Sequence, residues 1–505
     1  MNLVIHELSL SLVVKVALCQ QYWPSLSASP QLALRSQRDA GANVSIDQVF
    51  TVGVNVGQVL SAGGSYNETA ALDSLNNLLR VGVQSYVVDL NFSVEQNFTL
   101  SGSTMSFATF LATIRQYVTA SNNYLNANML VLLLRPNFAS AQSAFNDSLP
   151  MDLPNITAQL ESNLGLSNIY STLQLNSDRT QGLTVGYEGK PNTNGWPTLE
   201  YFLYKVQKRV VVAYTDANSS DTLPSDYIFD GSALSFEMSN TTVSCPINDS
   251  VELAGVAQKG WRYLETQFVP SDIREYIMCG YSPIIRNSFT PQNISGISDL
   301  LQNSLLWSWA YNEPNNYETT KSNATSLVAR RCAVVHYTAV NSTSYWAVAN
   351  CYDKSRSLCR NKENIFNWVL SKENDDYFST HEDDEDICPD NYTLALPQTP
   401  LEEAALNAYF NSFALEDHEA WVDLNSISVP DCWVPGGPYA SCPYQKEVSS
   451  RNFVGIITPV SVFSALTIAL LLFLTWRKVP IQDNRKRWKK IVNMHSSAEK
   501  EGVPS

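Results

Sequence analysis

The sequence predicts an α/β protein: a (β/α)-barrel-like domain, then a disulfide-rich α+β domain, then one C-terminal transmembrane helix. Three observations predict this arrangement. Apolar strand-like runs alternate with helix-like runs over residues 20–309, no cysteine lies between residues 20 and 244, and residues 454–476 carry no charge. Alternation of buried strands with helices is typical of a parallel sheet, and about 290 residues suits a barrel.

The N-terminus, residues 1–19, is interpreted as a signal peptide. Residues 8–14 are apolar, and Ala17 and Cys19 supply small residues at the −3 and −1 positions of a cleavage after Cys19. Lys15 interrupts the apolar run, so the alternative is a buried N-terminal helix.

Residues 454–476 are interpreted as a transmembrane helix. At 1.5 Å per residue they span about 35 Å, enough for a bilayer core. The basic tail, residues 477–505, follows immediately, which predicts a cytosolic tail and a lumenal or extracellular N-terminal part. We therefore expect a single-pass type I protein in a secretory-pathway or cell-surface membrane; a buried core helix is the alternative.

The charge is divided between these parts. The formal net charge is −15, and the tail, with eight basic and three acidic residues, contributes +5, so the rest carries −20. An acidic body argues against direct nucleic-acid binding, which needs a positive surface. The basic tail is expected to contact anionic lipid.

Potential glycosylation sites support the same topology. Thirteen Asn-X-Ser/Thr sequons lie between the predicted signal peptide and the predicted span, where lumenal enzymes would reach them. We expect a glycoprotein, with sites at Asn43, Asn67, Asn91, Asn97, Asn146, Asn155, Asn218, Asn240, Asn248, Asn293, Asn323, Asn341 and Asn391.

The cysteines predict disulfides rather than a metal site. Removal of Cys19 leaves an even number, as a disulfide framework requires. The chain has no C-x-x-C pair and few histidines, so zinc is not favoured, and we expect no metal and no cofactor. The disulfide candidates are Cys245, Cys279, Cys332, Cys351, Cys359, Cys388, Cys432 and Cys442.

The elements of the first domain are read from apolar periodicity. The predicted strands are residues 49–56, 83–90, 129–134, 209–213 and 283–286. The predicted helices between them are residues 68–80, 107–117, 199–208 and 294–306. Gly82 is expected to stop the first of these helices.

Residues 78–90 (LLRVGVQSYVVDL) and 196–203 (WPTLEYFL) resemble phosphatidylinositol phospholipase C-type barrels. Those enzymes resolve a phosphodiester with two histidines, yet this chain has no histidine between His6 and His336. We therefore predict a non-catalytic barrel. The alternative is a phosphodiesterase- or phospholipase-like enzyme that uses Asp89 and Arg135 at strand ends, with the sequon Asn91 beside them.

A second resemblance lies in residues 307–360. Trp307-Ser-Trp309, Glu313-Pro-Asn, Cys332 and the Trp346–Cys351 stretch are similar to the closing half of a C-type lectin-like domain. The resemblance implies that Cys332 pairs with Cys351. It also implies Ca²⁺ ligands after Trp346, but Ala347 and Val348 offer no side-chain oxygen, so we expect no Ca²⁺ site. A glycan-binding receptor is the alternative.

The rest of this Cys-rich lectin-like membrane-proximal region, residues 310–452, contains three further features. Eight acidic residues within 373–386 predict a solvated loop. Residues 401–413 predict a helix, and the Pro- and Gly-rich stretch from Cys432 to Cys442 is typical of a disulfide-closed loop.

Five strings together resemble the fungal family of maintenance of telomere capping protein 6. They are SQRDAGANVSIDQ (36–48), LWSWA (306–310), CPDNYTLALPQTP (388–400), WVDLN (421–425) and CWVPGGP (432–438). The resemblance implies a type I membrane glycoprotein with a genetic link to telomere capping, and it brings no catalytic residues.

A lumenal acidic body cannot touch chromosome ends, so we expect any telomere role to be indirect. The leading hypothesis is a non-enzymatic lumenal binding or scaffold protein with a protein or lipid partner.

Overall fold

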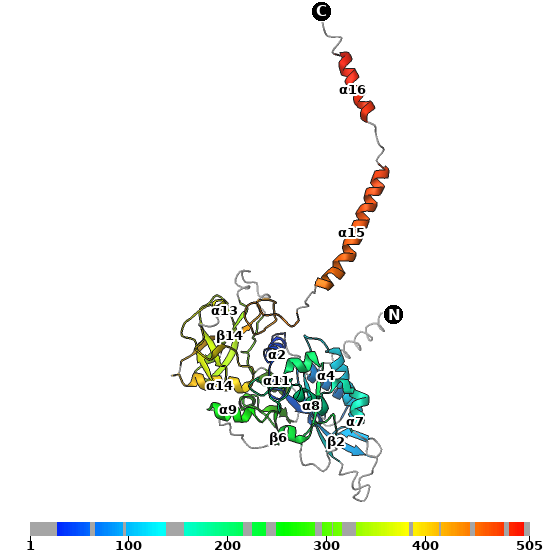
Figure 1. Cartoon of the computed structure of the whole chain (residues 1–505). Coiled ribbons are helices and arrows are strands. Elements are labelled where there is room, and N and C mark those ends of the chain that lie inside the picture. The colour runs from blue at the N-terminus through cyan, green and yellow to red at the C-terminus, as the bar shows by residue number, and fades with distance from the viewer. Residues whose placement is uncertain are drawn as a thin grey trace, which may run out of the picture. The chain divides into compact units, whose positions relative to one another are not determined.

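The fold is described from a computed structural model (Figure 1). It describes residues 28–60, 66–93, 97–137, 156–215, 225–238, 249–287, 295–305, 307–315, 330–382, 387–413, 416–444, 450–478 and 484–498. The predicted signal peptide lies outside these residues. The chain divides into two compact units, residues 1–444 and 445–505, and each is described by itself.

The first part of the larger unit is built on a parallel sheet with the strand order β5-β4-β2-β1-β8-β7-β6. An antiparallel hairpin strand, β3, extends β2. The strands are β1 (Gly53–Asn55), β2 (Ser85–Ser93), β3 (Asn97–Leu100), β4 (Leu130–Asn137), β5 (Val210–Tyr214), β6 (Ser235–Met238), β7 (Arg262–Thr266) and β8 (Ser282–Ile285).

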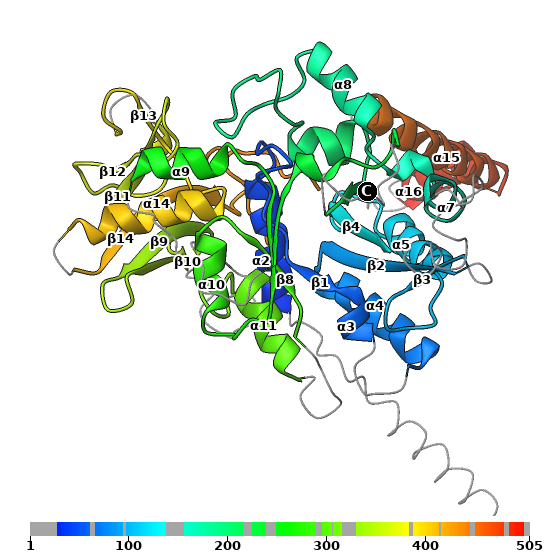
Figure 2. The same cartoon turned by 90° about the horizontal axis from the view of Figure 1, so that it is seen from below.

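Helices connect these strands and cover the outer face of the sheet (Figure 2). They are α2 (Ala28–Ala40), α3 (Val56–Leu60), α4 (Glu68–Val81), α5 (Phe107–Ala120), α7 (Ile156–Gln159), α8 (Thr172–Thr180), α9 (Ser250–Ala257), α10 (Ile273–Met278) and α11 (Ser295–Leu305). The predicted helix 199–208 is helical over residues 199–205, with π-type geometry over Tyr201–Lys205, and it ends three residues early.

The sheet is a partial barrel and does not close as a complete (β/α)-barrel would. In the described part of the chain β5 and β6 do not pair, and Ile169 and Phe229 each form an isolated bridge to β5. The Phe229 amide donates to the Val212 carbonyl at 2.8 Å, and the Tyr214 amide donates to the Phe229 carbonyl at 3.0 Å. Bulky aromatic side chains, including Trp196, pack in the interior core on this side.

Local sequence explains the elements that the prediction located well. Asn67 caps α4 by accepting a hydrogen bond from the Ala70 amide, and Gly82 ends the helix at φ +106°, a conformation that glycine adopts readily. The predicted strand 49–56 is reduced to β1. Gly53 lies at its start because a Cβ there would approach Ile284 Cδ1 to 2.3 Å and Ser85 Cβ to 2.8 Å.

The second part of the larger unit is a mixed six-stranded sheet with the order β10-β9-β14-β11-β12, and β13 pairs with β11. Its elements are β9 (Cys332–Thr338), β10 (Thr343–Ala349), β11 (Arg356–Asn361), β12 (Trp368–Leu370), α13 (Ser379–Glu382), β13 (Tyr392–Leu394), α14 (Pro400–Asn411) and β14 (His418–Asn425).

The two parts pack against each other within one unit. Helix α14 contacts α9 and α10 of the barrel (Figure 2). Trp309, just after the barrel, lies edge-on to Trp346 and Trp433, and its indole nitrogen donates to Ser36 Oγ at 2.6 Å. A shared aromatic core therefore ties the Cys-rich part to the barrel.

The acidic stretch 373–386 is only partly the solvated loop that its charge predicted. Tyr377 within it is fully buried, and the Trp421 indole donates to the Asp375 carbonyl at 2.8 Å. Residues 383–386 lie outside the described part of the chain. Burial of Tyr377 anchors the described half of this stretch to the second sheet.

The smaller unit contains two helices, α15 (Ser450–Lys478) and α16 (Asn484–Ala498) (Figure 1). Within α15, residues Thr458–Trp476 are long and apolar enough to cross a membrane. Pro459 lies inside α15, nine residues after its first residue, where it removes one hydrogen bond of the helix backbone.

Candidate functional site

Strand alternation in the barrel places polar residues in one layer at the carboxyl ends of the strands. Successive side chains of a strand point to opposite faces, so residues two apart share a face. Val87, Leu133, Tyr263 and Ile284 belong to the interior core. Two residues further along come, respectively, Asp89, Arg135, Glu265 and Arg286.

Asn55, the last residue of β1, completes this set, which we call the polar layer: Asn55, Asp89, Arg135, Glu265 and Arg286. The carboxyl ends of parallel strands carry the active sites of barrel enzymes, which makes the polar layer the candidate functional site.

Arg135 joins two carboxylates across the layer. Its Nε donates to Asp89 Oδ1 at 2.6 Å, and its Nη1 donates to Glu265 Oε2 at 2.8 Å. The remaining Nη2 donates to Asp89 Oδ2 and Glu265 Oε1, both at 3.2 Å. The guanidinium therefore makes forked contacts with both carboxylates, the geometry in which arginine binds carboxylates most strongly.

Asn55 crosslinks the same two carboxylates from the neighbouring strand. Its amide nitrogen donates to Glu265 Oε1 at 2.8 Å and to Asp89 Oδ2 at 3.0 Å. Its side-chain oxygen accepts from the Gln58 amide at 3.2 Å, which fixes the orientation of the amide group.

Burial differs strongly across the layer. The side chain of Glu265 is completely buried, whereas those of Asp89 and Arg135 are 31% and 22% exposed. Arg286 lies at the rim, 46% exposed, with Nε 3.8 Å from Glu265 Oε1. Burial alone would lower the pKa of Arg135, but Asp89 and Glu265 outweigh burial and raise it. Arg135 is therefore held as a cation.

Two residues of β6 close the side of the layer. Arg135 Nη1 donates weakly to Met238 Sδ at 3.2 Å, and its guanidinium carbon lies 5.7 Å from the Phe236 ring centre. Each nitrogen of the Arg135 guanidinium is thus already engaged inside the protein.

The structure brings together the two residues that the sequence singled out at the strand ends. Asp89 and Arg135, the two residues proposed from sequence as an alternative catalytic pair, are in direct contact. Asn55, Glu265 and Arg286 were missed. A signal was available, because Glu265 follows the aromatic-rich strand-like run Trp261-Arg-Tyr-Leu264, as Asp89 follows Tyr86-Val-Val88.

The chemistry open to the layer is limited by the pairing of its groups. General acid–base catalysis needs a group that exchanges a proton near the working pH, most often histidine. The barrel sequence holds no histidine, and its two carboxylates in this layer are bound by the same arginine. Such an arrangement stabilises the sheet edge more readily than it transfers protons.

The disulfides of the second part tie strands and loops of the mixed sheet together. Cys332 pairs with Cys351, as the lectin-like resemblance implied, and the other described pairs are Cys359–Cys388 and Cys432–Cys442. Cys279 is also disulfide-bonded, and Cys245 lies outside the described residues.

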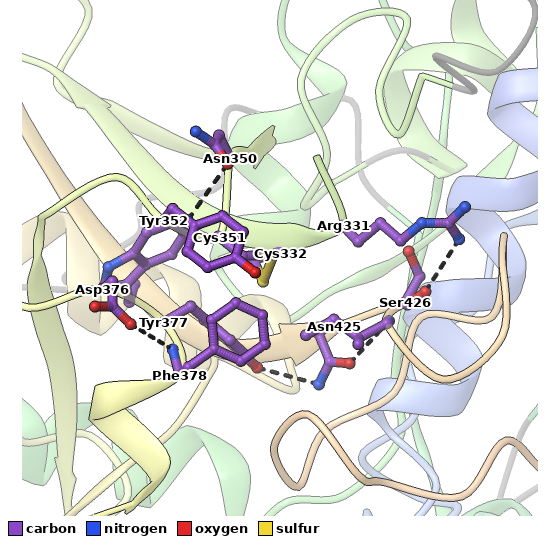
Figure 3. The surroundings of a disulfide bond; sticks show 12 residues. Arg331, Cys332, Asn350, Cys351, Tyr352, Asp376, Tyr377, Phe378, Asn425 and Ser426 are labelled. Atoms are coloured by element: carbon purple, nitrogen blue, oxygen red, sulfur yellow. Dashed lines mark hydrogen bonds between the residues drawn. A yellow bond between two sulfur atoms is a disulfide. The ribbon is translucent and has the colours of Figure 1, made fainter. Parts of the chain in front are cut away.

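Tyr377 packs beside the Cys332–Cys351 disulfide (Figure 3). Its amide donates to the Cys351 carbonyl at 3.0 Å, and its hydroxyl accepts from Asn425 Nδ2 at 3.2 Å. The disulfide is thus enclosed by the packed half of the acidic stretch and by the end of β14.

The residues for which the lectin-like resemblance implied a Ca²⁺ loop make local contacts. Glu313 Oε2 accepts from the Asn315 amide at 3.0 Å. Ala347 and Val348 are part of β10 and supply no oxygen ligand. Among the residues that the structure describes, no group of three His, Cys, Asp or Glu side chains is placed to hold a metal.

A buried polar cluster lies where the Cys-rich part meets the barrel. Arg274 of α10 donates to the carbonyls of Trp307 and Ser344 at 3.0 and 2.9 Å. Glu403 of α14 is fully buried and accepts a hydrogen bond from the Ser344 hydroxyl. Burial raises the pKa of Glu403 to about 7, although Ser344 and Arg274 oppose the shift.

The predicted glycosylation sites fall into three groups. Asn43, Asn67, Asn341 and Asn391 are exposed. Asn91, two residues beyond Asp89 on β2, is half-buried, and Asn97 begins β3. The other sites lie outside the described residues: Asn146, Asn155, Asn218, Asn240, Asn248, Asn293 and Asn323.

Comparison with known proteins connects this fold to a family. A family model described as "MTC6 partial TIM-barrel domain" matches residues 24–307. The maintenance of telomere capping protein 6 of Lachancea thermotolerans is 53% identical and covers 100% of both chains. The protein of that name from Saccharomyces cerevisiae S288c is 37% identical over 96% of this chain and 93% of its own.

Among solved structures, phosphatidylinositol-specific phospholipase C from Listeria monocytogenes aligns with a TM-score of 0.30 and 10% identity. The alignment covers 54% of this chain and 98% of that protein.

Proposed function

This chain belongs to the family of maintenance of telomere capping protein 6, and we propose that its folded body is a non-catalytic binding or scaffold module in the secretory-pathway lumen or at the cell surface. The body is the barrel together with the disulfide-bonded part. We propose that α15 anchors it in the membrane as a type I glycoprotein.

The observation that carries this proposal is the internal pairing of the polar layer. Arg135 is bound on both sides by Asp89 and Glu265, and Asn55 crosslinks the same carboxylates. A phosphate ligand would have to displace a carboxylate before it could reach this arginine. The groups of the site are therefore arranged to satisfy one another, as in a structural ion-pair network.

The composition of the smaller unit supports the anchor and its orientation. The 19 residues Thr458–Trp476 carry no charge, and Arg477 and Lys478 follow at once. Basic residues on one flank of an apolar span favour that flank on the cytosolic side. The disulfides in residues 332–442 favour an oxidising compartment for the body.

With this proposed topology, any role of the protein in telomere capping is indirect. A body behind a membrane does not reach chromosome ends, and only residues 477–505 would face the cytosol or nucleus. We propose that the body binds a lumenal protein or lipid and that capping depends on membrane, lipid or protein-maturation state. Restoration of capping by a soluble tail alone would contradict this.

A carboxylate-based phosphodiesterase is the second candidate, and one observation favours it. Asp89, Arg135 and Glu265 sit at the carboxyl edge of the parallel sheet, where barrel enzymes carry their catalytic groups. We propose that the Cys-rich part has a lectin-like fold whose role is to pack against the barrel. A Ca²⁺-dependent glycan receptor, the third hypothesis, would need oxygen ligands that Ala347 and Val348 lack.

The first experiment tests the topology on sealed yeast microsomes that contain the chain with a C-terminal tag. Added protease should remove only the tag, and deglycosylation should shrink the protected body. Replacement of the exposed Asn391 by Gln provides a matched control, because it should remove a single glycan. An unglycosylated body open to protease would overturn the proposal.

A further inference from the structure

Helix α16 carries an apolar stripe along one side. Trp488, Ile491 and Val492 are spaced i, i+3 and i+4, which places them on one face of an α-helix, and His495 at i+7 continues that face. None of them is packed into the structure: Trp488 is 65% exposed and Val492 57% exposed. A helix with an apolar stripe needs an apolar surface to cover it.

Basic residues occupy the rest of the helix. At 100° per residue, Arg485 and Arg487 flank the stripe, and Lys486, Lys489 and Lys490 lie on the opposite side. The segment from Arg485 to Lys490 holds five cations and no acidic residue. The surface that covers α16 must therefore be apolar opposite the stripe and negatively charged opposite the flanking arginines.

The position of α16 in the chain indicates which surface this is. Only residues 479–483 separate it from α15, whose last residues are at the proposed cytosolic side of the membrane. At about 3.5 Å per extended residue, that linker reaches no further than roughly 20 Å from the bilayer edge. The anionic inner leaflet is within that reach at a fixed, high local concentration.

We propose that α16 is an interfacial helix that binds the anionic phospholipids of the membrane that α15 spans. Its apolar stripe enters the headgroup–acyl boundary, and Arg485 and Arg487 bind lipid phosphates at the border of the stripe. The inference rests on the proposed orientation of α15. It assigns the lipid contact expected of the basic tail to one face of α16.

The experiment uses the full-length protein in vesicles of phosphatidylcholine with or without phosphatidylserine, oriented with the tail outward. A fluorophore is attached to a single introduced cysteine, in a Cys19→Ser background, and quenched with brominated lipid. The three labelled variants are Val492→Cys on the stripe, Asn493→Cys on the opposite face and Leu470→Cys within α15.

We expect quenching at 470 in all vesicles, quenching at 492 only with phosphatidylserine, and no quenching at 493. Quenching at 470 without quenching at 492 in either membrane overturns the inference, while α15 still spans the membrane. This is the result expected if α16 binds a protein instead. Equal quenching at 492 in neutral vesicles overturns anionic recognition. Absence of quenching at 470 defeats the span itself.

Charge variants test the role of the two border arginines. Each basic residue near an anionic surface contributes about fivefold to partitioning, so Arg485→Gln with Arg487→Gln should weaken α16 binding about 25-fold. The pair Arg485→Lys and Arg487→Lys should retain binding. Lys486→Gln with Lys490→Gln, on the far side, is the matched control and should have a smaller effect; an equal effect would refute the assigned face.

Discussion

Replacement of Arg135 by methionine is the perturbation that bears most directly on the polar layer. The substitution keeps much of the side-chain volume and removes the cation. Glu265, whose side chain is completely buried, would keep the Asn55 amide at 2.8 Å and a distant Arg286 at 3.8 Å. Removal of one partner of a buried ion pair costs about 3–5 kcal/mol, and we expect the lower end because Asp89 is 31% exposed.

The expected consequence is a lower unfolding midpoint. With an unfolding entropy of about 2.1 cal/mol/K per residue over a unit of roughly 420 residues, 1 kcal/mol shifts the midpoint by about 1 °C, so Arg135→Met should lower it by roughly 3–4 °C. The assay is thermal unfolding of the detergent-solubilised chain, followed by the fluorescence of the buried barrel tryptophans Trp196 and Trp261. Arg286→Met is the matched control, with an expected change of under about 1 kcal/mol.

A double variant separates structural from chemical roles. In Arg135→Met with Glu265→Gln no buried charge is left unpaired, so we expect most of the lost stability to return, with a coupling energy of about 2 kcal/mol. If this variant also restores capping in a deletion strain, the network is structural. A stable double variant that fails to restore capping would refute the non-catalytic interpretation, and an unchanged midpoint for Arg135→Met would refute the stability argument.

Three further predictions concern stability. Replacement of Cys332 and Cys351 by alanine should lower the unfolding free energy by about 3 kcal/mol, as expected for a loop of 19 residues. Reductant should then lower the unfolding free energy of this variant by less than it lowers that of the parent. Because burial raises the folded-state pKa of Glu403 from 4.5 to about 7, the folded protein retains a proton there that the unfolded chain loses, and stability should fall as pH rises across that window. Glu403→Gln should remove this part of the pH dependence and be more stable than the parent at pH 8 by roughly 3 kcal/mol, measured as midpoints from pH 4 to 8. Arg209→Met, which frees the carbonyls that the buried guanidinium holds at the end of α5, should cost about 3 kcal/mol, whereas the exposed Lys205→Met should cost almost nothing in the same assay.

The features that could be predicted from sequence are those set by neighbours along the chain. The helix over Glu68–Val81 follows from its cap at Asn67 and its stop at Gly82. Parallel strands separated by helices follow from apolar runs of strand length. The position of Asp89 and Arg135 at one sheet edge follows because each comes directly after the apolar run of its strand, and the register of β2 and β4 places the two residues opposite each other.

The features that were missed depend on contacts between distant segments. Arg135 and Glu265 are 130 residues apart, so their pairing requires the strand order across the sheet. In the described part of the chain β5 and β6 do not pair, and Phe229 and Trp196, which are far apart in sequence, pack against each other beside β5; apolar periodicity encodes neither feature. In the acidic stretch, the signal overlooked was Tyr377, an aromatic residue whose burial offsets the tendency of its charged neighbours to remain in water.

The surfaces of the barrel that remain open limit how any ligand can be bound. The side formed by α9 and α10 is covered by α14, and Arg274 ties that contact to Ser344. At the carboxyl edge, a ligand that recruits Arg135 must displace a carboxylate partner in a partly buried site, where unpaired charges are costly. A scaffold has no such requirement, since its ion pairs need only hold the strand ends in place. The pairing therefore favours recognition through the surrounding surface over chemistry at the strand ends.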